Sequence, residues 1–199
     1  AEYYHLESDW LIEVDITANR SDALSHYGVA RDLYAWLRRN GYETSLHRPS
    51  CDDFKVDNES LPIEVEIDNT DACKRYACVS ITGCEVKESP QWLKDKLSTI
   101  GLRPINNIVD ITNYVMLATG QPTHAFDSDH IAGHVIVRRA GEGEKLLLLN
   151  GKELPLSTDD LVIADDAGVV GLAGVMGGAK DSILSTTHRV ILEIANFDA

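Results

Sequence analysis

The chain has 199 residues, 44% of them hydrophobic, and carries 32 acidic against 18 basic side chains, for a formal net charge of −14. This length and composition suit one large domain, or a domain with a small appendage, that buries its own core. The negative charge argues against a module that grips long nucleic acid, because phosphate contacts need basic side chains. No apolar run reaches the roughly 18 residues of a membrane-spanning helix, so we expect no membrane partner.

The two ends and the cysteines indicate a piece of a cytoplasmic protein. The first residues, AEYYHLESDW, contain no starting methionine and no basic-then-apolar secretion signal. The last residues, VILEIANFDA, stop just after a strand-like run, so we expect the chain to be cut from a longer protein. Cysteines 51, 73, 78 and 84 form no CxxC pair, which argues against structural zinc and fits a reducing compartment.

Residues 1–46 predict a strand and a helix that lead into the rest of the chain. LIEVDI, at 11–16, alternates like a strand, and residues 19–42 carry apolar side chains at helical spacing up to a terminal glycine. Residues 47–60, HRPSCDDFKVDNES, are polar and without a pattern, which indicates a linker.

Strand patterns dominate the predicted domain at 61–199. Two helices interrupt them, one at 89–101 with Ser89 placed to cap it, and one at 106–120 that ends at a glycine. Hairpins are predicted within 144–156, around Asn150–Gly151, and within 160–175, around Ala167 and Gly168, before a last strand RVILEIA. Strands joined by short turns, with a few helices, favour an α+β fold over a doubly wound one.

The glycine run GLAGVMGGAKDS, at 171–182, fails as a phosphate-binding loop. Lys180 follows alanine instead of glycine, Asp181 stands where serine or threonine is needed, and no helical pattern follows. A tight, closely packed turn region is the favoured interpretation.

The stretch HAFDSDHIAGH, at 124–134, offers histidines and acids that a metal could bind. Its spacing matches no helical histidine pair, so turn histidines among solvated acids are favoured over a metal site. Histidine is the side-chain type whose unperturbed pKa lies nearest neutrality, but a lone histidine such as His124 is more often structural than catalytic.

Three other polar residues leave alternatives open. Glu193 shares a strand face with Ile191 and Ala195, so it is a solvent-facing acid near an edge or a pocket carboxylate that accepts a hydroxyl or amine. Thr112 and Asn113 suit a small polar ligand and, equally, hydrogen bonds to the helix backbone.

Four segments together resemble a known family. They are GLRPINNIVDITNYVMLATGQPTHAFDSD, VIVRRAGEGEKLLLLNGKE, LVIADDAGVVGLAGVMGG and VILEIANFD. In this order they are similar to the B3/B4 editing module of bacterial phenylalanyl-tRNA synthetase β subunits, and EVDITANRSDALSHYGVARDL is similar to the segment before it. The resemblance runs from about residue 11 to 199. It implies a strand-rich, layered β/β/α sandwich of mixed or antiparallel sheets, plus the N-terminal helical segment.

The resemblance also implies an activity: hydrolysis of tyrosyl-tRNA wrongly made on tRNA(Phe), as proofreading within a phenylalanine–tRNA ligase. ATP and Mg²⁺ would serve the synthetic reaction elsewhere in the ligase, so we expect no cofactor or metal in this piece. The implied partners are the 3′ end of the misacylated tRNA, the ligase α subunit and the remaining β-subunit domains. The alternative is a non-catalytic interaction module of a synthetase or tRNA-modifying complex, which gains if Glu193 and His124 do not face one cavity.

By family position, His124 is the catalytic candidate near the ester and the terminal adenosine, and Glu193 receives the tyrosyl hydroxyl. The remaining positions implied for the same site are lining residues, a basic residue at the rim and small wall residues: Pro122, Thr112, Asn113, Arg103, Ala173 and Gly174. No Ser-His-Asp or Cys-His arrangement is found in the sequence, so we expect no covalent intermediate. A further pocket segment of the family, with a threonine and an alanine, is expected downstream of this chain.

Overall fold

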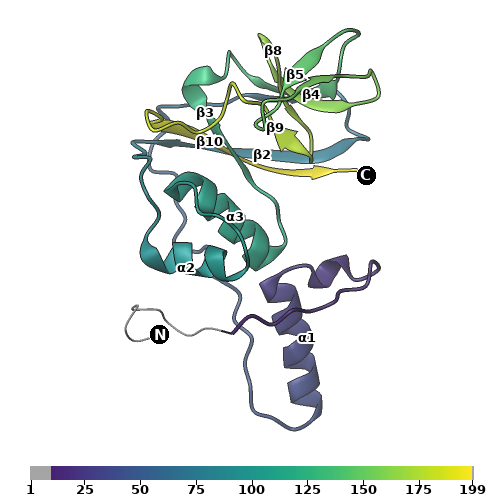
Figure 1. Cartoon of the computed structure of the whole chain (residues 1–199), viewed down its shortest axis with the longest axis vertical. Coiled ribbons are helices and arrows are strands. Elements are labelled where there is room, and N and C mark those ends of the chain that lie inside the picture. Colours follow the sequence, from purple (N-terminus) through teal and green to yellow (C-terminus); the bar gives the residue numbers. More distant parts are fainter. Residues whose placement is uncertain (1–9, 199) are drawn as a thin grey trace. The chain divides into compact units, whose positions relative to one another are not determined.

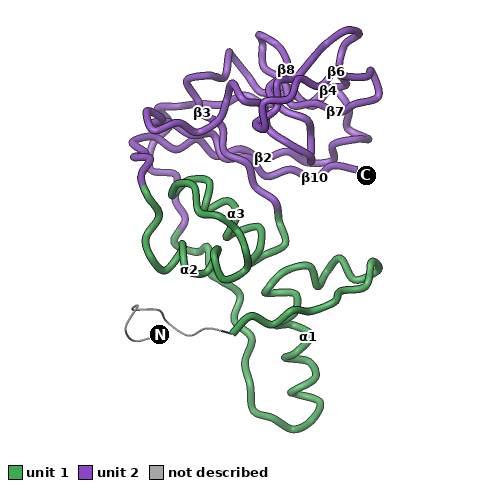
Figure 2. Tube along the Cα trace, viewed as in Figure 1, with its two compact units in different colours: residues 1–53, 88–121 green, residues 54–87, 122–199 purple. Residues whose placement is uncertain are grey.

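The computed structural model describes residues 10–198; residues 1–9, which carry most of the stretch read for a secretion signal, and residue 199 lie outside them. The chain divides into two compact units (Figure 2). Unit 1 holds the residues up to 53 together with 88–121, and unit 2 holds 54–87 together with 122–199. The chain therefore passes between the units three times, whereas the predicted domains at 1–46 and 61–199 follow one another; those domain limits stay a prediction. Within residues 10–198, no helix is both long and apolar enough to cross a membrane.

The first helix of unit 1, α1 (His26–Arg39), follows a short 3-10 turn, η2 (Ser21–Ala23). The Ser25 hydroxyl caps it by accepting a hydrogen bond from the Gly28 backbone N–H, and two arginines in its last turn suit the negative end of the helix dipole. The strand predicted at 11–16 was wrong for the described residues, since that stretch pairs with no strand. An alternating pattern supplies one half of a ladder, and a strand forms only where a partner supplies the other.

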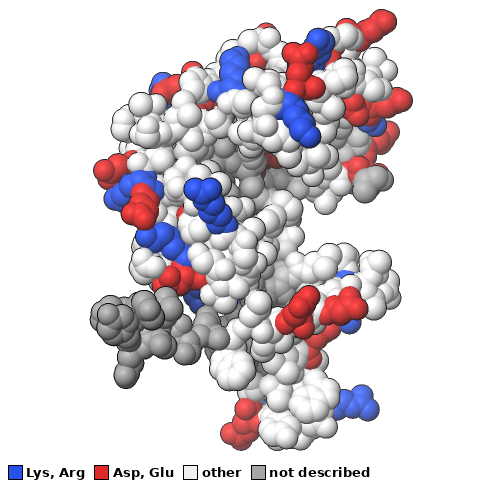
Figure 3. Space-filling view, in the orientation of Figure 1, with Lys and Arg blue, Asp and Glu red and all other residues white. Residues whose placement is uncertain are grey.

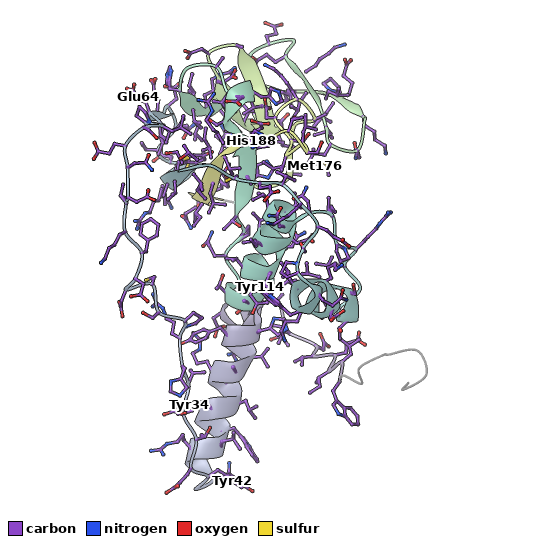
Figure 4. All side chains as sticks on the ribbon, turned by 90° about the vertical axis from the view of Figure 1, so that its left-hand side faces the viewer. Tyr34, Tyr42, Glu64, Tyr114, Met176 and His188 are labelled. Carbon is purple, nitrogen blue, oxygen red and sulfur yellow. The ribbon has the colours of Figure 1, made fainter. Side chains whose placement is uncertain are left out.

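Two further helices of unit 1 confirm the predicted helices, α2 (Gln91–Thr99) and α3 (Asn107–Thr119). The Asn106 side chain caps α3 by accepting from the N–H groups of Ile108 and Val109, and Gly120, at φ 79°, ends it. The rings of Trp92 on α2 and Tyr114 on α3 form an edge-to-face pair with centroids 5.6 Å apart, and Figure 4 labels Tyr114.

One fully buried acid ties α2 to α3. Asp110 accepts hydrogen bonds from the Ser89 hydroxyl at 2.5 Å and from the Ile105 N–H at 2.9 Å, and its side chain is 0% exposed. The prediction that Ser89 caps α2 was therefore wrong, because its hydroxyl is committed to Asp110 and the cap position falls to Pro90. This buried side chain therefore links the segments before α2 and before α3 to the first part of α3.

Unit 2 contains two main sheets (Figure 1). The five-stranded sheet has the order β1 (Val65–Ile67), β4 (Val135–Arg139), β7 (Leu161–Asp165), β8 (Gly168–Leu172), β9 (Met176–Gly177); the β1–β4 pair is parallel and the others antiparallel. The three-stranded sheet has the antiparallel order β2 (Cys73–Thr82), β10 (Arg189–Phe197), β3 (His124–Asp127). A 3-10 turn, η3 (Ser128–His130), follows β3. The predicted α+β class, with mixed and antiparallel sheets, is confirmed.

Both predicted hairpins are present. β5 (Lys145–Leu147) pairs with β6 (Glu153–Pro155), and β7 pairs with β8. Gly151, at φ 78°, supplies the left-handed conformation that the tight turn needs.

The main core of unit 2 lies between the two sheets. Phe126 and Ile191 enter it from the three-stranded sheet, and Val137, Ile163 and Val170 enter it from the five-stranded sheet. Val162 precedes Ile163 on β7 and belongs to a second core cluster, with residues of the β5–β6 hairpin. Because neighbouring strand residues point to opposite faces, the two clusters cover the two faces of the five-stranded sheet.

Two buried acids of unit 2 differ sharply in their partners. Asp165 accepts backbone hydrogen bonds from Ala132, Ala167 and Gly168 at 2.8–3.0 Å. Asp181, which follows the glycine run, is 1% exposed, and neither of its carboxylate oxygens has a hydrogen-bond partner among residues 10–198. Burial raises the pKa of Asp181 to about 6, because water no longer solvates the charged form.

We expect Asp181→Asn to stabilise the chain at pH 8 by about 3 kcal/mol, the equivalent of a pKa raised by about two units. A raised carboxyl pKa costs stability above the folded-state value and costs nothing below the unfolded one. The gain should therefore shrink as the pH falls through about 6 and vanish near about pH 4. Urea unfolding across this range measures it.

The matched control is Asp165→Asn, at an acid that is equally buried but fully hydrogen-bonded. It is expected to destabilise the chain at pH 8, because an amide cannot accept all three backbone bonds. An Asp181→Asn chain that is less stable than the parent at pH 8 would contradict this assignment.

Candidate functional site

His124 and Glu193 stand directly opposite each other on the paired strands β3 and β10. Opposed residues of an antiparallel pair project to the same face, so the imidazole and the carboxyl group are neighbours. Phe126 and Ile191, two residues further along the same strands, form the next pair and belong to the main core. Both polar side chains therefore face the interior of unit 2.

Glu193 is a buried acid, 8% exposed, and not a solvent-facing strand residue. The Tyr76 phenol, from β2, donates a hydrogen bond to its Oε2 at 2.8 Å, and Cys78 of β2 lies opposite it. Burial raises the pKa of Glu193 to about 7, and the bond from Tyr76 opposes this rise. The carboxyl group therefore gains and loses its proton near neutral pH.

His124 is partly buried beside Glu193, and burial lowers the pKa of its imidazole below the usual value. Its ring meets Phe126 edge-on, with centroids 4.5 Å apart and an interplanar angle of 70°. The ring is therefore neutral at physiological pH, with one nitrogen that donates and one that accepts a hydrogen bond. It can orient a water molecule or a hydroxyl group without bringing a positive charge to the site.

The glycine run closes against the His124 ring. A Cβ atom at Gly177, on β9, would lie 2.6 Å from Cε1 and 2.7 Å from Nε2 of His124, so a side chain at this position would displace the imidazole. Met176, labelled in Figure 4, marks the position of β9 next to Gly177. The predicted tight turn region thus places the Gly177 backbone in close contact with the His124 imidazole.

The predicted wall residues Ala173 and Gly174 lie in the same run but have other contacts. Ala173 packs against the main core. Gly174, at φ 70°, faces the ring of Phe197, and a Cβ atom added at Gly174 would lie 3.3 Å from that ring. Gly177 was missed because a glycine run does not reveal which member meets the histidine. Tyr76 was missed because its partner is distant in sequence.

The remaining predicted site residues divide between the units. Pro122 lies in unit 2, two residues before His124, whereas Arg103, Thr112 and Asn113 lie in unit 1. The Thr112 hydroxyl donates to the Val109 carbonyl at 2.7 Å, which is the helix-backbone alternative considered for it. Arg103 is exposed after α2. That these three residues share a site with His124 stays a prediction.

The histidines of the 124–134 stretch have separate surroundings. His134 lies 2.8 Å from Asp166 and 3.3 Å from Glu66, and the nearest acid of His130 is Asp127, at 3.9 Å. Across residues 10–198, no group of three or more His, Cys, Asp or Glu side chains is arranged to hold a metal ion.

A family model described as "B3/4 domain" matches residues 72–199, and the chain belongs to this family. Its relatives include proteins named phenylalanine–tRNA ligase β subunit. The one from Bacteroides fragilis (strain YCH46) is 51% identical over 197 residues, which are 98% of this chain and 24% of the relative. The one from Porphyromonas gingivalis (strain ATCC BAA-308 / W83) is 50% identical over 200 residues, 100% of this chain and 24% of the relative.

The chain thus spans about a quarter of the length of these β subunits, and the resemblance identified from the sequence is confirmed. A crystal structure of an N-terminal fragment of the phenylalanyl-tRNA synthetase β subunit from Pyrococcus horikoshii has a TM-score of 0.55 and 18% identity to this chain. The match covers 90% of this chain and 53% of the fragment and supports the fold.

We expect Gly177→Ala to displace the His124 imidazole, because the new Cβ would lie within 2.7 Å of two ring atoms. Two-dimensional NMR of the imidazole C–H groups should show the His124 signal moved and its titration midpoint changed. Overpacking of this kind costs about 1–3 kcal/mol of stability.

Gly171→Ala is the matched control, since the nearest atom to its new Cβ would lie at an ordinary 3.6 Å. It should leave the His124 signal in place. An unchanged His124 signal in Gly177→Ala would show that the glycine run does not pack against this ring.

Proposed function

We propose that this chain carries the proofreading hydrolysis of a phenylalanine–tRNA ligase, cleaving the ester of tyrosyl-tRNA(Phe). The observation that carries the proposal is the pairing of a buried carboxyl group with a neutral imidazole on one interior sheet face. Membership of the B3/4 family and similarity to ligase β subunits support it.

The chemistry explains why such a ligase needs a second site. Tyrosine is phenylalanine with one added hydroxyl group, and an apolar synthetic pocket rejects an added hydroxyl only about a hundredfold. A site built to bond that hydroxyl rejects phenylalanine far more strongly, because its buried polar group would be left without a partner. Glu193, buried and able to accept a hydrogen bond, has the properties of such a receiver.

His124 would act at the other end of the substrate, beside the ester and the terminal adenosine. An aminoacyl ester is already reactive, so a neutral imidazole that positions water, or the free ribose hydroxyl, is sufficient. Pro122, Ala173 and Gly174 would line the pocket, with Thr112 and Asn113 as polar contacts and Arg103 at the rim. No covalent intermediate is required.

The surface charge fits a module that handles only the end of a tRNA. The net charge is −14. On the face of the molecule that Figure 3 displays, basic side chains are scattered among acidic ones and form no large basic patch. The rest of the tRNA would be held by the α subunit and by other β-subunit domains, in the cytoplasm. ATP and Mg²⁺ would serve the aminoacylation reaction in those other parts.

The test is hydrolysis of tyrosyl-tRNA(Phe) and phenylalanyl-tRNA(Phe) by the chain and by the β subunit that contains it. We expect selective tyrosyl hydrolysis. Glu193→Ala should lower it at least tenfold and abolish the preference for tyrosine. His124→Ala should slow both esters about 100-fold, at the lower limit of acid–base contributions.

Glu153→Ala, at an exposed acid on β6, is the control and should change neither rate. If both the chain and the longer β subunit leave tyrosyl-tRNA intact, the proposal fails, and the non-catalytic interaction module becomes the better account. Activity in the longer subunit alone would assign the missing part of the site to its other segments.

A further inference from the structure

Glu193, the proposed acceptor of the substrate hydroxyl group, already accepts a hydrogen bond from Tyr76 of the same chain. Tyr76 lies on β2 opposite Ala195, and Cys78 lies opposite Glu193, so Tyr76 is the diagonal neighbour of the acid across the β2–β10 pair. Its phenol donates to Oε2 at 2.8 Å, and its ring packs against the main core. Strand pairing and core packing together fix the direction of this donor.

A glutamate side chain reaches its carboxyl group through three rotatable bonds, so a free carboxyl group would sample several directions. The Tyr76 bond holds one oxygen and therefore orients the other. A carboxylate accepts several hydrogen bonds, so Oε1 keeps its capacity to accept another donor while Oε2 is occupied. The protein thus presents its own phenol to the group that would receive the phenol of a substrate.

We infer that Tyr76 is a specificity-determining positioning residue, which anchors Oε2 of Glu193 so that Oε1 accepts the hydroxyl group of a tyrosine-type ligand. This inference rests on the proposed editing function. It assigns a role to a residue of β2, a strand that none of the predicted site residues occupies.

The charge state of Glu193 links this role to pH. The titratable groups that face the acid are Tyr76, Cys78 and Cys73 on β2 and His124 on β3. Burial raises the pKa of the Cys78 thiol to about 12 and also raises those of Cys73 and the Tyr76 phenol, while it lowers that of His124. All four are neutral near pH 7, so the Tyr76 bond is the interaction that favours the ionised carboxylate.

The experiment compares the 199-residue chain with its Tyr76→Phe variant, in which one oxygen atom is removed. Carboxyl-carbon NMR of the glutamate-labelled protein gives the Glu193 titration midpoint, which should rise by about one pH unit or more. At pH 7 the tyrosyl-over-phenylalanyl hydrolysis ratio should fall about tenfold, mainly through a higher KM for the tyrosyl ester. The ratio should recover only in part toward pH 9, where the carboxyl group is ionised again but Oε2 still lacks the bond that orients it. A merely structural role would move neither the midpoint nor the pH profile.

Two further variants keep the test decisive. Tyr34→Phe, the same chemical change on α1, should leave midpoint and ratio unchanged. In Glu193→Gln, the ratio should become independent of pH, and adding Tyr76→Phe should cause little further loss, since both changes act through one group. If Tyr76→Phe instead caused a general folding defect, the double variant would lose further activity relative to Glu193→Gln alone.

The outcomes separate the inference from the function it rests on. An active parent chain whose Tyr76→Phe variant keeps its midpoint or its selectivity overturns the inference and leaves the editing function standing. A parent that hydrolyses neither ester, alone or within its β subunit, removes the editing function and the inference with it.

Discussion

The antiparallel register of β3 against β10 is the constraint on which the proposed chemistry depends. It sets His124 opposite Glu193 and Phe126 opposite Ile191, so one polar pair follows one apolar pair along the inner face of the three-stranded sheet. A slip of β3 by one residue along β10 would turn His124 and Phe126 to the other face, away from Glu193 and Ile191. Burial of Phe126 and Ile191 in the core opposes such a slip, so the packing that stabilises unit 2 also positions its candidate site.

The uncharged surroundings of this pair explain its electrostatics. A carboxyl group buried among a phenol, thiols and a neutral imidazole has no cation to hold its charge, so it titrates near neutrality. The imidazole in the same environment loses its charge for the same reason. The site can therefore offer a hydrogen-bond acceptor and a neutral ring without the strong field of an ion pair, which suits recognition of a neutral hydroxyl group. Asp181, in the same unit, is likewise buried, and its lack of hydrogen-bond partners among residues 10–198 makes its ionised form costly to stability.

Local sequence signals predicted the features that local chemistry controls. Asn150–Gly151 predicted the β5–β6 hairpin, and apolar spacing predicted α3, because turn and helix preferences act over a few residues. His124 and Glu193 became site candidates through family resemblance, since either residue type alone fits a structural role. The sequence could not show that Gly177 meets the imidazole or that Ser89 bonds Asp110 instead of capping α2. Those contacts depend on tertiary packing between segments that no local pattern connects.

The central claim is that Glu193 receives the hydroxyl group of a tyrosyl ligand while His124 lies at the ester end. The most direct measurement is a crystal structure with a hydrolysis-resistant ligand, adenosine that carries tyrosine through a 3′ amide in place of the ester. The account predicts the ligand's phenol oxygen within hydrogen-bond distance, about 2.5–3.0 Å, of Glu193 Oε1, with the adenosine end beside His124. A ligand bound elsewhere, or bound here with its phenol away from Glu193, would contradict it.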